Sequence, residues 1–492
     1  MRVPLVAGTR VAVVDAAEDD VVLIPPAPGE AIDDVAAAVR DAVRFPLEGE
    51  PLEALVTRGA RATIVVEPPA LPIPSSATDP RPLAIEAAVD ELSRLGVPSR
   101  RQTLLVAGGL ARRAGQRELE AFVPPPLARR FEGKVEVHDA EEERLVALGG
   151  ARIHPALVET DLVVAVTAAE TVLSGGPGAL LAAADAATVR AAGAESLLEP
   201  ASASGWSAAQ AIEDALRARA PALGISLALN HPRFSDALGG YPYRPEALER
   251  IARSRLRPLF GALPASARAR ILQSLRAEAS VAAVYAGPVG VAHAEALLRT
   301  IEARAASVAG PFDTICIGIP RTTPYLPRER PNPLLAASLG LGHALRLWRG
   351  QSPLAEGGTV ILVHRFHRHF THPTQQPYRA FFTAARWGRD EEALAVAEAE
   401  AAADAGALER YRAGRSCHPL LPFADWDACA PALARAGSIL VAGCRDAAAA
   451  RQLGFVPVHG LGPALAMARA RHDGGRVGFL VAPPFFPLSS AG

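Results

Sequence analysis

The chain has 492 residues, which is too long for one ordinary hydrophobic core, so we expect at least two domains. Half of the residues are hydrophobic but only 5% are aromatic, which favours a core of alanine, valine and leucine in helices packed on parallel strands. With 51 basic and 52 acidic side chains the net charge is −1, so no overall field favours nucleic acid or an anionic membrane surface.

The scarcity of lysine and the spacing of the cysteines argue against several classes of protein. The chain contains one lysine, Lys134, and lacks the GxxxxGK(S/T) pattern of a Walker A loop. The four cysteines are widely spaced and form no CxxC pair, which argues against a zinc ribbon or a disulfide scaffold. We expect a cytoplasmic protein without signal peptide or membrane span, because no long apolar run occurs at the N-terminus or elsewhere.

Short apolar runs alternate with helical patterns over the first 160 residues. Strands are predicted at 61–66, 101–109, 134–139 and 161–166, with an amphipathic helix at 81–96. The runs are continuously apolar, which is typical of a mostly parallel sheet covered on both faces. Such sheets bind ligands at the carboxyl ends of their strands. The candidate site loops are therefore 67–79, 107–115, 138–142 and 167–178.

A second alternating series follows a region rich in proline and arginine at 231–268. Its predicted strands are 281–287, 312–320, 357–366, 437–443 and 476–484, and its predicted helices are 333–348, 391–412 and 461–471. The sequence therefore predicts an α/β fold with two doubly wound, mostly parallel domains, residues 1–265 and 266–492, and a cleft between them.

Segments in both halves resemble the nickel-pincer lactate racemase family. EPPALPIPS follows the first predicted strand, LARRAGQREL follows the second, and the fourth leads into Ser174, Gly175 and Gly176. FDTICIGIP, NPLLAASLGLGHALRLWRG and PLAEGGTVILVHR resemble the C-terminal domain of a subgroup of this family. The resemblance implies a racemase or epimerase of 2-hydroxy acids, in which the cofactor accepts a hydride and histidines handle the hydroxyl proton.

The residues that carry this chemistry in the family are replaced here. The positions where the resemblance places a cofactor-bonded lysine, after the paired glycines, read Pro-Gly-Ala at 177–179. The expected catalytic histidines read Ala111 and Thr171 or a neighbour, and the substrate-binding arginine reads Leu71. No histidine lies in 155–230, where the nickel ligand is expected. The nickel-pincer nucleotide is implied by the resemblance, but no lysine lies nearby in sequence to tether it.

Other positions of the family pattern are retained. The candidate cofactor-binding residues, by resemblance, are Ser174, Gly175 and Gly176. The candidate substrate-binding residues are Glu67, Arg112 and Asn332. Asn332 directly precedes the helix predicted at 333–348, so capping of that helix is the role we favour for it over contact with a carboxylate ligand.

Histidines cluster in HRFHRHFTH, residues 364–372, directly after the apolar run GGTVILV. Imidazole is the commonest neutral metal ligand, so His364, His367 and His369 are candidate metal ligands. No HExxH motif occurs, and no carboxylate lies inside the cluster. The same segment, rich in arginine, is alternatively a loop that binds an anion or lies solvated, and we favour this alternative.

Three functions follow from these observations. The first is a 2-hydroxy-acid racemase or epimerase with altered ligation of a nickel-pincer or related cofactor. The second is a non-catalytic descendant that binds a small carboxylate or a partner protein in the cleft. The third is a metal-dependent enzyme of another class that uses residues 364–372. The residue chemistry favours the second function over the first, because an alanine cannot transfer a proton.

Overall fold

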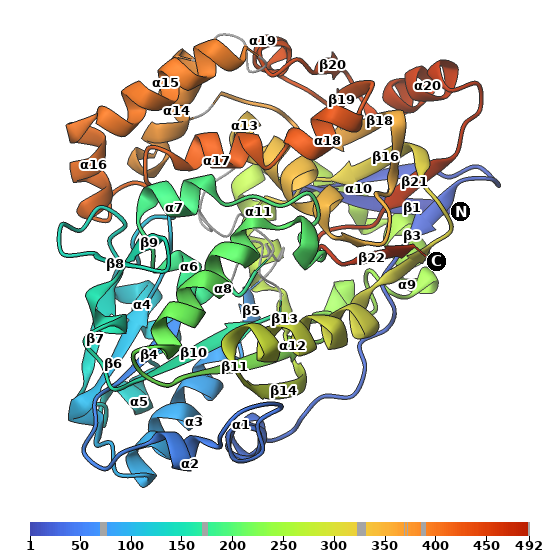
Figure 1. Cartoon of the computed structure of the whole chain (residues 1–492). Helices are drawn as coiled ribbons and strands as arrows, with labels where there is room; N and C mark the ends of the chain where they lie inside the picture. Colours follow the sequence, from blue (N-terminus) through green and yellow to red (C-terminus); the bar gives the residue numbers. More distant parts are fainter. Residues whose placement is uncertain are drawn as a thin grey trace.

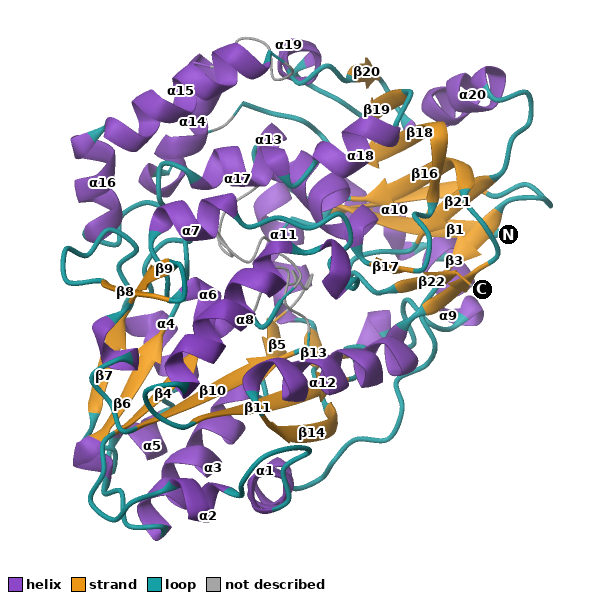
Figure 2. Ribbon diagram, in the orientation of Figure 1, coloured by secondary structure: helices purple, strands orange, loops and turns teal. Residues whose placement is uncertain are grey.

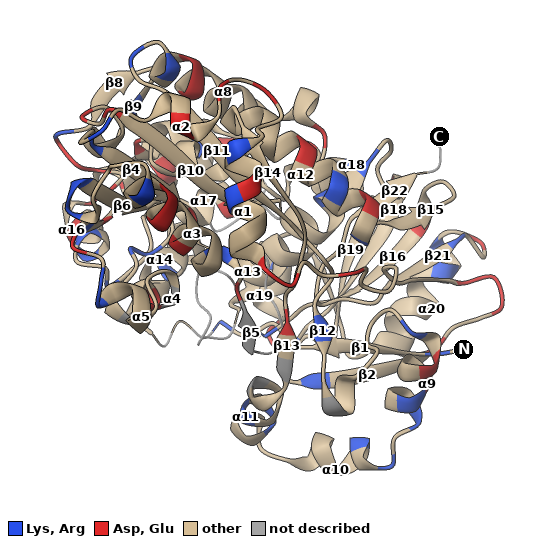
Figure 3. Cartoon of the chain, turned by 90° about the horizontal axis from the view of Figure 1, so that it is seen from below, with Lys and Arg blue, Asp and Glu red and all other residues tan. Residues whose placement is uncertain are grey.

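The computed structural model describes residues 1–68, 76–169, 176–321, 331–368, 370, 372–384 and 390–490. Within these residues, two mostly parallel six-stranded sheets form the centre of the molecule, and helices lie around and between them (Figures 1 and 2). The α/β fold with mostly parallel sheets that the sequence predicted is therefore confirmed. Basic and acidic residues are interspersed over both halves of the molecule (Figure 3).

The first sheet has the strand order β14–β11–β10–β4–β6–β7. Its strands are β4 (Ala62–Val66), β6 (Gln102–Val106), β7 (Lys134–Val137), β10 (Leu162–Ala168), β11 (Ala222–Leu229) and β14 (Val281–Gly287). The strands predicted in the first half of the chain all belong to this sheet, whereas β11 was not predicted. We placed 281–287 in the second series, but β14 pairs antiparallel with β11. A local apolar pattern locates a strand without specifying its partner.

The second sheet has the order β20–β19–β18–β16–β21–β3, and all of its pairings are parallel. Its strands are β3 (Val21–Leu23), β16 (Phe312–Gly318), β18 (Leu354–Val363), β19 (Ser438–Ala442), β20 (Val456–Val458) and β21 (Val477–Leu480). β3 comes from the first part of the chain and β14 from beyond residue 265. The boundary predicted between residues 265 and 266 therefore does not separate the strands of the two sheets.

Small sheets join further parts of the chain. They contain β1 (Arg2–Ala7) with β2 (Arg10–Asp15), β8 (Val146–Leu148) with β9 (Ala151–Ile153), β5 (Ser76–Thr78) with β12 (Arg233–Phe234) and β13 (Arg276–Glu278), and β15 (Ala306–Val308) with β17 (Trp348–Arg349) and β22 (Leu488–Ser490). The turn between β1 and β2 is attached to the second sheet, because the Gly8 N–H donates to the Ile319 carbonyl at 2.8 Å, just beyond β16.

The helices of the first half lie on both sides of the first sheet (Figure 1). On one side are α1 (Val35–Arg44), α2 (Leu52–Leu55), α3 (Arg81–Arg94), α4 (Gln116–Phe122) and α5 (Pro125–Ala128). On the other side are α6 (Gly178–Ala182), α7 (Ala186–Ala191), α8 (Ser204–Arg217) and α12 (Val289–Arg304). No helix in the described part of the chain is long and apolar enough to cross a membrane.

The remaining helices lie in the half of the molecule that contains the second sheet (Figure 1). They are α9 (Pro245–Arg253), α10 (Leu256–Ala262), α11 (Ala265–Ser274), α13 (Pro333–Ala337), α14 (Gln376–Ala384), α15 (Glu391–Ala403), α16 (Ala405–Arg412), α17 (Leu421–Asp427), α18 (Ala430–Arg435), α19 (Ala447–Gln452) and α20 (Leu461–Arg471). After α13 the chain continues through a π-helical turn, η5 (Ser338–His343), and a 3-10 turn, η6 (Ala344–Arg346). The helix predicted at 333–348 is therefore irregular beyond Ala337, whereas the one predicted at 461–471 matches α20.

Alternate residues of the central strands face different hydrophobic cores, as the pleat of a strand requires. Val65 of β4 and Ile317 of β16 belong to one core that extends across both sheets. Val66 faces a second core beneath α1 and α3, and Cys316 faces a third core beside β1 and α20. The loops between the two sheets are therefore positioned by a core that the sheets share.

A buried carboxylate connects α8 to α12. Oε1 of Glu213 accepts from the Val289 N–H at 2.6 Å and Oε2 from the Gly290 N–H at 2.8 Å. Pro288, which precedes α12, provides no side-chain cap, so Glu213 satisfies the first N–H groups of this helix. Burial raises the pKa of Glu213 above its ordinary value, against the opposing effect of these two donors.

We expect Glu213→Ala to lower the free energy of unfolding by about 2 kcal/mol, because it leaves two buried N–H groups without an acceptor. Chemical denaturation measures the loss. The matched control is Asp214→Ala on the exposed side of the same helix, where a change below about 0.5 kcal/mol is expected. Equal losses in the two variants would contradict the capping role of Glu213.

Candidate functional site

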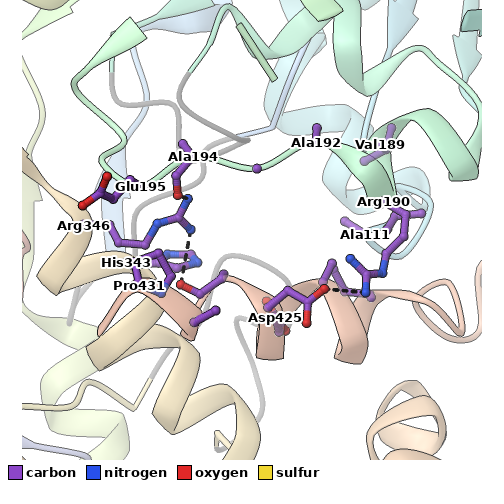
Figure 4. A pocket seen from close by; sticks show the side chains of 18 residues that line it. Ala111, Val189, Arg190, Ala192, Ala194, Glu195, His343, Arg346, Asp425 and Pro431 are labelled. Atoms are coloured by element: carbon purple, nitrogen blue, oxygen red, sulfur yellow. Dashed lines mark hydrogen bonds and ion pairs between the residues drawn. The ribbon is translucent and has the colours of Figure 1, made fainter. Parts of the chain in front are cut away.

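A cavity of about 350 Å³ lies between the first-sheet half and the second-sheet half of the molecule (Figure 4). One wall comes from the loop after β6, from α7 and from the segment after α7; the other comes from η5, η6, α17 and α18. The 18 lining residues are Gly108, Leu110, Ala111, Val189, Arg190, Ala192, Gly193, Ala194, Glu195, His343, Arg346, Leu421, Ala424, Asp425, Asp427, Ala428, Ala430 and Pro431.

Two arginines connect the two walls of this cavity, which is called the interdomain cavity below. Nε of Arg190 on α7 donates to Glu398 at 2.6 Å, and its Nη2 donates to Asp427 of α17 at 2.6 Å. The buried guanidinium of Arg346 donates to the carbonyls of Ala194, from one wall, and of Ala428, from the other. Figure 4 shows the two arginines on opposite sides of the cavity. Both guanidinium groups therefore hold the two halves of the chain together.

Asp425 and His343 are the buried titratable groups of the cavity wall. Oδ1 of Asp425 accepts from the Ser338 hydroxyl at 3.1 Å, and Oδ2 accepts from the Tyr378 hydroxyl at 2.6 Å. Burial raises the pKa of Asp425 to about 7, although both hydrogen bonds oppose the shift. Burial and the nearby charge of Arg346 lower the pKa of His343 to about 3, so His343 is neutral near pH 7. Asp425 therefore changes charge near neutral pH.

Arg112, a candidate substrate-binding residue, is engaged elsewhere. Its Nη2 donates to Glu118 at 2.6 Å, and its Nη1 donates to the Gly414 carbonyl at 3.3 Å. Glu118 in turn accepts from the Gly115 N–H at 2.9 Å, at the start of α4. Arg112 therefore stabilises a helix start and a contact between the two halves. Its neighbour Ala111, where the resemblance places a histidine, does line the cavity.

Glu67 and Gly176 lie outside the lining of the interdomain cavity. Glu67 is buried directly after β4, beside the carboxyl ends of β6 and β10. A Cβ atom on Gly176 would lie 2.8 Å from Cα of Trp206, so this glycine permits the close approach of α8. Ser174 and Gly175 lie outside the described residues. The retained Gly176 thus has a packing reason that needs no cofactor.

Asn332, the third candidate for substrate binding, caps α13. Its Oδ1 accepts from the N–H groups of Leu334 and Leu335, both at 3.0 Å. The capping role favoured from the sequence is confirmed. Asn332 is not among the residues that line the interdomain cavity.

The candidate metal ligands His364 and His367 line a second, smaller pocket together with four arginines. His369 lies outside the described residues. Among the residues that the structure describes, no group of three or more histidine, cysteine, aspartate or glutamate side chains is placed to hold a metal ion.

Sequence reasoning missed the charged residues of the interdomain cavity. Arg190, Asp425 and Asp427 lie on helices rather than in loops at strand ends, and no motif contains them. His343 and Arg346 offered one usable signal, because they interrupt the otherwise apolar run NPLLAASLGLGHALRLW. A basic residue inside such a run is rarely buried without a polar partner.

The single lysine lies far from this cavity along the sheet. Lys134 is exposed at the start of β7 and pairs in register with Thr103 of β6. Gly108, which lines the cavity, follows the other end of β6. Five residues of strand span about 16 Å. The backbone of Lys134 therefore lies at the amino ends of these strands, whereas the cavity lies beyond their carboxyl ends.

Comparison with known proteins relates the chain to one family. Residues 9–200 match the family model of the lactate racemase N-terminal domain. The structure is similar to the lactate racemase apoprotein from Thermoanaerobacterium thermosaccharolyticum, with a TM-score of 0.61 and 14% identity over 99% of this chain and 100% of that one. A structural-genomics crystal structure from Thermotoga maritima matches with a TM-score of 0.49 and 10% identity over 94% and 100%. No curated protein matches in sequence.

The raised pKa of Asp425 predicts a specific dependence of stability on pH. Between about pH 4 and pH 7 the folded state keeps a proton on Asp425 that the unfolded state releases, so the unfolding free energy falls as the pH rises through this window. In Asp425→Asn this fall, on the order of 4 kcal/mol at most, should disappear. Denaturation at several pH values measures it.

The difference between wild type and Asp425→Asn isolates this residue from the buried histidines, whose lowered pKa values give the opposite trend. Asp19→Asn, in an exposed turn after β2, is the control and should follow the wild-type profile. Identical profiles for wild type and Asp425→Asn would contradict the raised pKa.

Proposed function

We propose, since this chain is a member of the lactate racemase-like family, that it binds a small 2-hydroxy acid or a related carboxylate in the interdomain cavity without the family's lysine-tethered nickel chemistry. The observation that carries this proposal is the lining of the cavity. A cavity lies between the two halves, and the positions where the resemblance places the side chains that handle a cofactor and a proton hold other residues.

The residues present do not fit the nickel-pincer nucleotide that the resemblance implies. Ala111 occupies the cavity wall at a histidine position, and a methyl group cannot accept a proton. The single amine side chain, Lys134, is exposed at the opposite edge of the first sheet. Pro177 and Gly178 follow Gly176 as buried residues, and neither offers a nucleophilic side chain.

The cavity suits a small organic acid by size. Pockets for small molecules usually measure roughly 300–1,000 Å³, and this one, at about 350 Å³, lies at the lower end. Its lining is largely alanine, glycine, leucine and valine, which can surround the carbon skeleton of such a ligand. A larger cofactor together with a substrate would exceed this space.

The charged groups of the wall suit a carboxylate and a hydroxyl group. Arg346, held by main-chain carbonyls, brings a positive charge to one side of the cavity. Asp425 can donate a hydrogen bond when protonated and accept one when ionised, and both states are populated near pH 7. Protonation removes a negative charge from the wall, so an anionic ligand should bind more tightly at pH 6 than at pH 8.

Binding of 2-hydroxy acids, from glycolate to 2-hydroxyisocaproate, can be measured by calorimetry with the full chain. A Cβ atom on Gly193 would meet no atom within 4 Å, so Gly193→Leu should project into the cavity without backbone strain. We expect this variant to weaken binding by about tenfold or more. Gly462→Leu, equally open but exposed on α20, is the matched control. Equal affinities in both variants would exclude the interdomain cavity as the site.

The loss of the family's chemistry is tested separately. After coexpression with cofactor-synthesis enzymes, the purified chain should carry no stoichiometric nickel, because no lysine is placed to bond the cofactor. It should also form no D-lactate from L-lactate, as measured by chiral chromatography. One nickel per chain together with formation of D-lactate would overturn the non-catalytic part of the proposal.

A further inference from the structure

A second pocket, of about 110 Å³, lies apart from the interdomain cavity and shares no residue with it. We propose that this pocket, here called the basic pocket, binds a phosphate group, either as free phosphate or as part of a small phosphorylated molecule. Its polar and charged lining includes Arg10, Arg268, Arg321, Arg365, His364 and His367.

The basic pocket forms where three distant parts of the chain meet. The turn after β1 contributes Gly8, which adopts a φ of +60° and donates its N–H to the Ile319 carbonyl. His364 and Arg365 directly follow β18, and Arg268 comes from α11. The pocket thus lies beyond the carboxyl ends of β16 and β18, which is the edge where parallel sheets bind ligands.

The charge of the basic pocket is of one sign. Of the described residues that line it, four are arginines and none carries a carboxylate. Burial lowers the pKa of Arg365, and the charges of Arg10, Arg445 and Arg268 lower it further. Guanidinium groups that repel one another in this way are brought together at an energetic cost. An anion in the pocket would offset that repulsion.

His364, which lines the same pocket, has an unsatisfied polar atom. Its side chain is 8% exposed, and its Nδ1 has no hydrogen-bond partner in the part of the chain that the structure describes. Burial and the neighbouring His367 lower its pKa to about 4, so the ring is neutral near pH 7. A buried ring nitrogen without a partner is costly, and a ligand oxygen or hydroxyl would satisfy it.

The chemistry of the lining selects a phosphate over a metal ion or a carboxylate. Four guanidinium groups repel a divalent cation, and none of the described residues that line the pocket offers a carboxylate to offset this. A phosphate carries about −1.5 to −2 charges near pH 7 and presents several oxygens to guanidinium forks. A carboxylate presents only one charge. At about 30 Å³ per water molecule, the pocket has room for a phosphate group but not for a nucleotide.

Calorimetry with the full chain tests this assignment, with inorganic phosphate and glycerol 3-phosphate as probes and acetate and chloride as comparison anions. We expect both phosphates to bind more tightly than acetate. Arg365→Ala and Arg10→Ala should each weaken phosphate binding by about tenfold or more. Arg100→Ala, an exposed arginine in the first half of the chain, is the matched control and should bind phosphate as wild type does. Circular dichroism checks that each variant is folded.

The outcomes separate this proposal from its alternatives. Tighter binding of glycerol 3-phosphate than of phosphate identifies a phosphorylated molecule as the ligand class, and equal binding identifies free phosphate. Absence of phosphate binding at millimolar concentration, or equal affinities in Arg365→Ala and Arg100→Ala, would overturn the proposal. So would stoichiometric zinc that His364→Ala removes. Gly193→Leu should keep phosphate binding, and Arg365→Ala should keep 2-hydroxy-acid binding, so the two proposed sites fail independently.

Discussion

Two strand pairings between distant parts of the sequence hold the molecule together. β3 pairs with β21 through Val21, Val22 and Leu23, and β14 pairs with β11 at the edge of the first sheet. Buried N–H and carbonyl groups must be paired, so each sheet depends on a strand from the other half of the chain. The chain therefore crosses between the sheets, one core extends across both, and the interdomain cavity and the basic pocket form where distant segments meet.

Packing accounts for two residues that the resemblance also singles out. Gly176 is needed because α8 approaches too closely for a Cβ atom, whatever binds nearby. Arg112 supports a helix start through Glu118 and contacts the other half of the chain at Gly414. Both residues therefore stabilise contacts between segments of this chain, independently of any ligand. A residue that matches a family pattern can therefore have a structural role that does not depend on the reaction.

The interdomain cavity is lined by charges of both signs, whereas the charged side chains that are described in the basic pocket are positive. This difference separates their proposed ligands. The interdomain cavity contains both arginines and carboxylates, and Asp425 makes its charge depend on pH near neutrality. The basic pocket contains arginines and histidines from β2, α11 and the end of β18, with no carboxylate among its described lining residues. An organic acid with a single negative charge suits the interdomain cavity, whereas a phosphate with up to two negative charges suits the basic pocket.

The sequence by itself determined features that depend on local pattern. Continuous apolar runs located β4, β6, β7 and β10, the helical pattern at 461–471 located α20, and the residue before a helix start marked Asn332 as a cap. The absence of a usable lysine was also a matter of sequence. Only the tertiary structure decided the partners of β3 and β14, the pKa of Asp425 and the meeting of Arg10, Arg268 and Arg365. These features depend on which segments pack together and how completely they exclude water, and no local pattern specifies either.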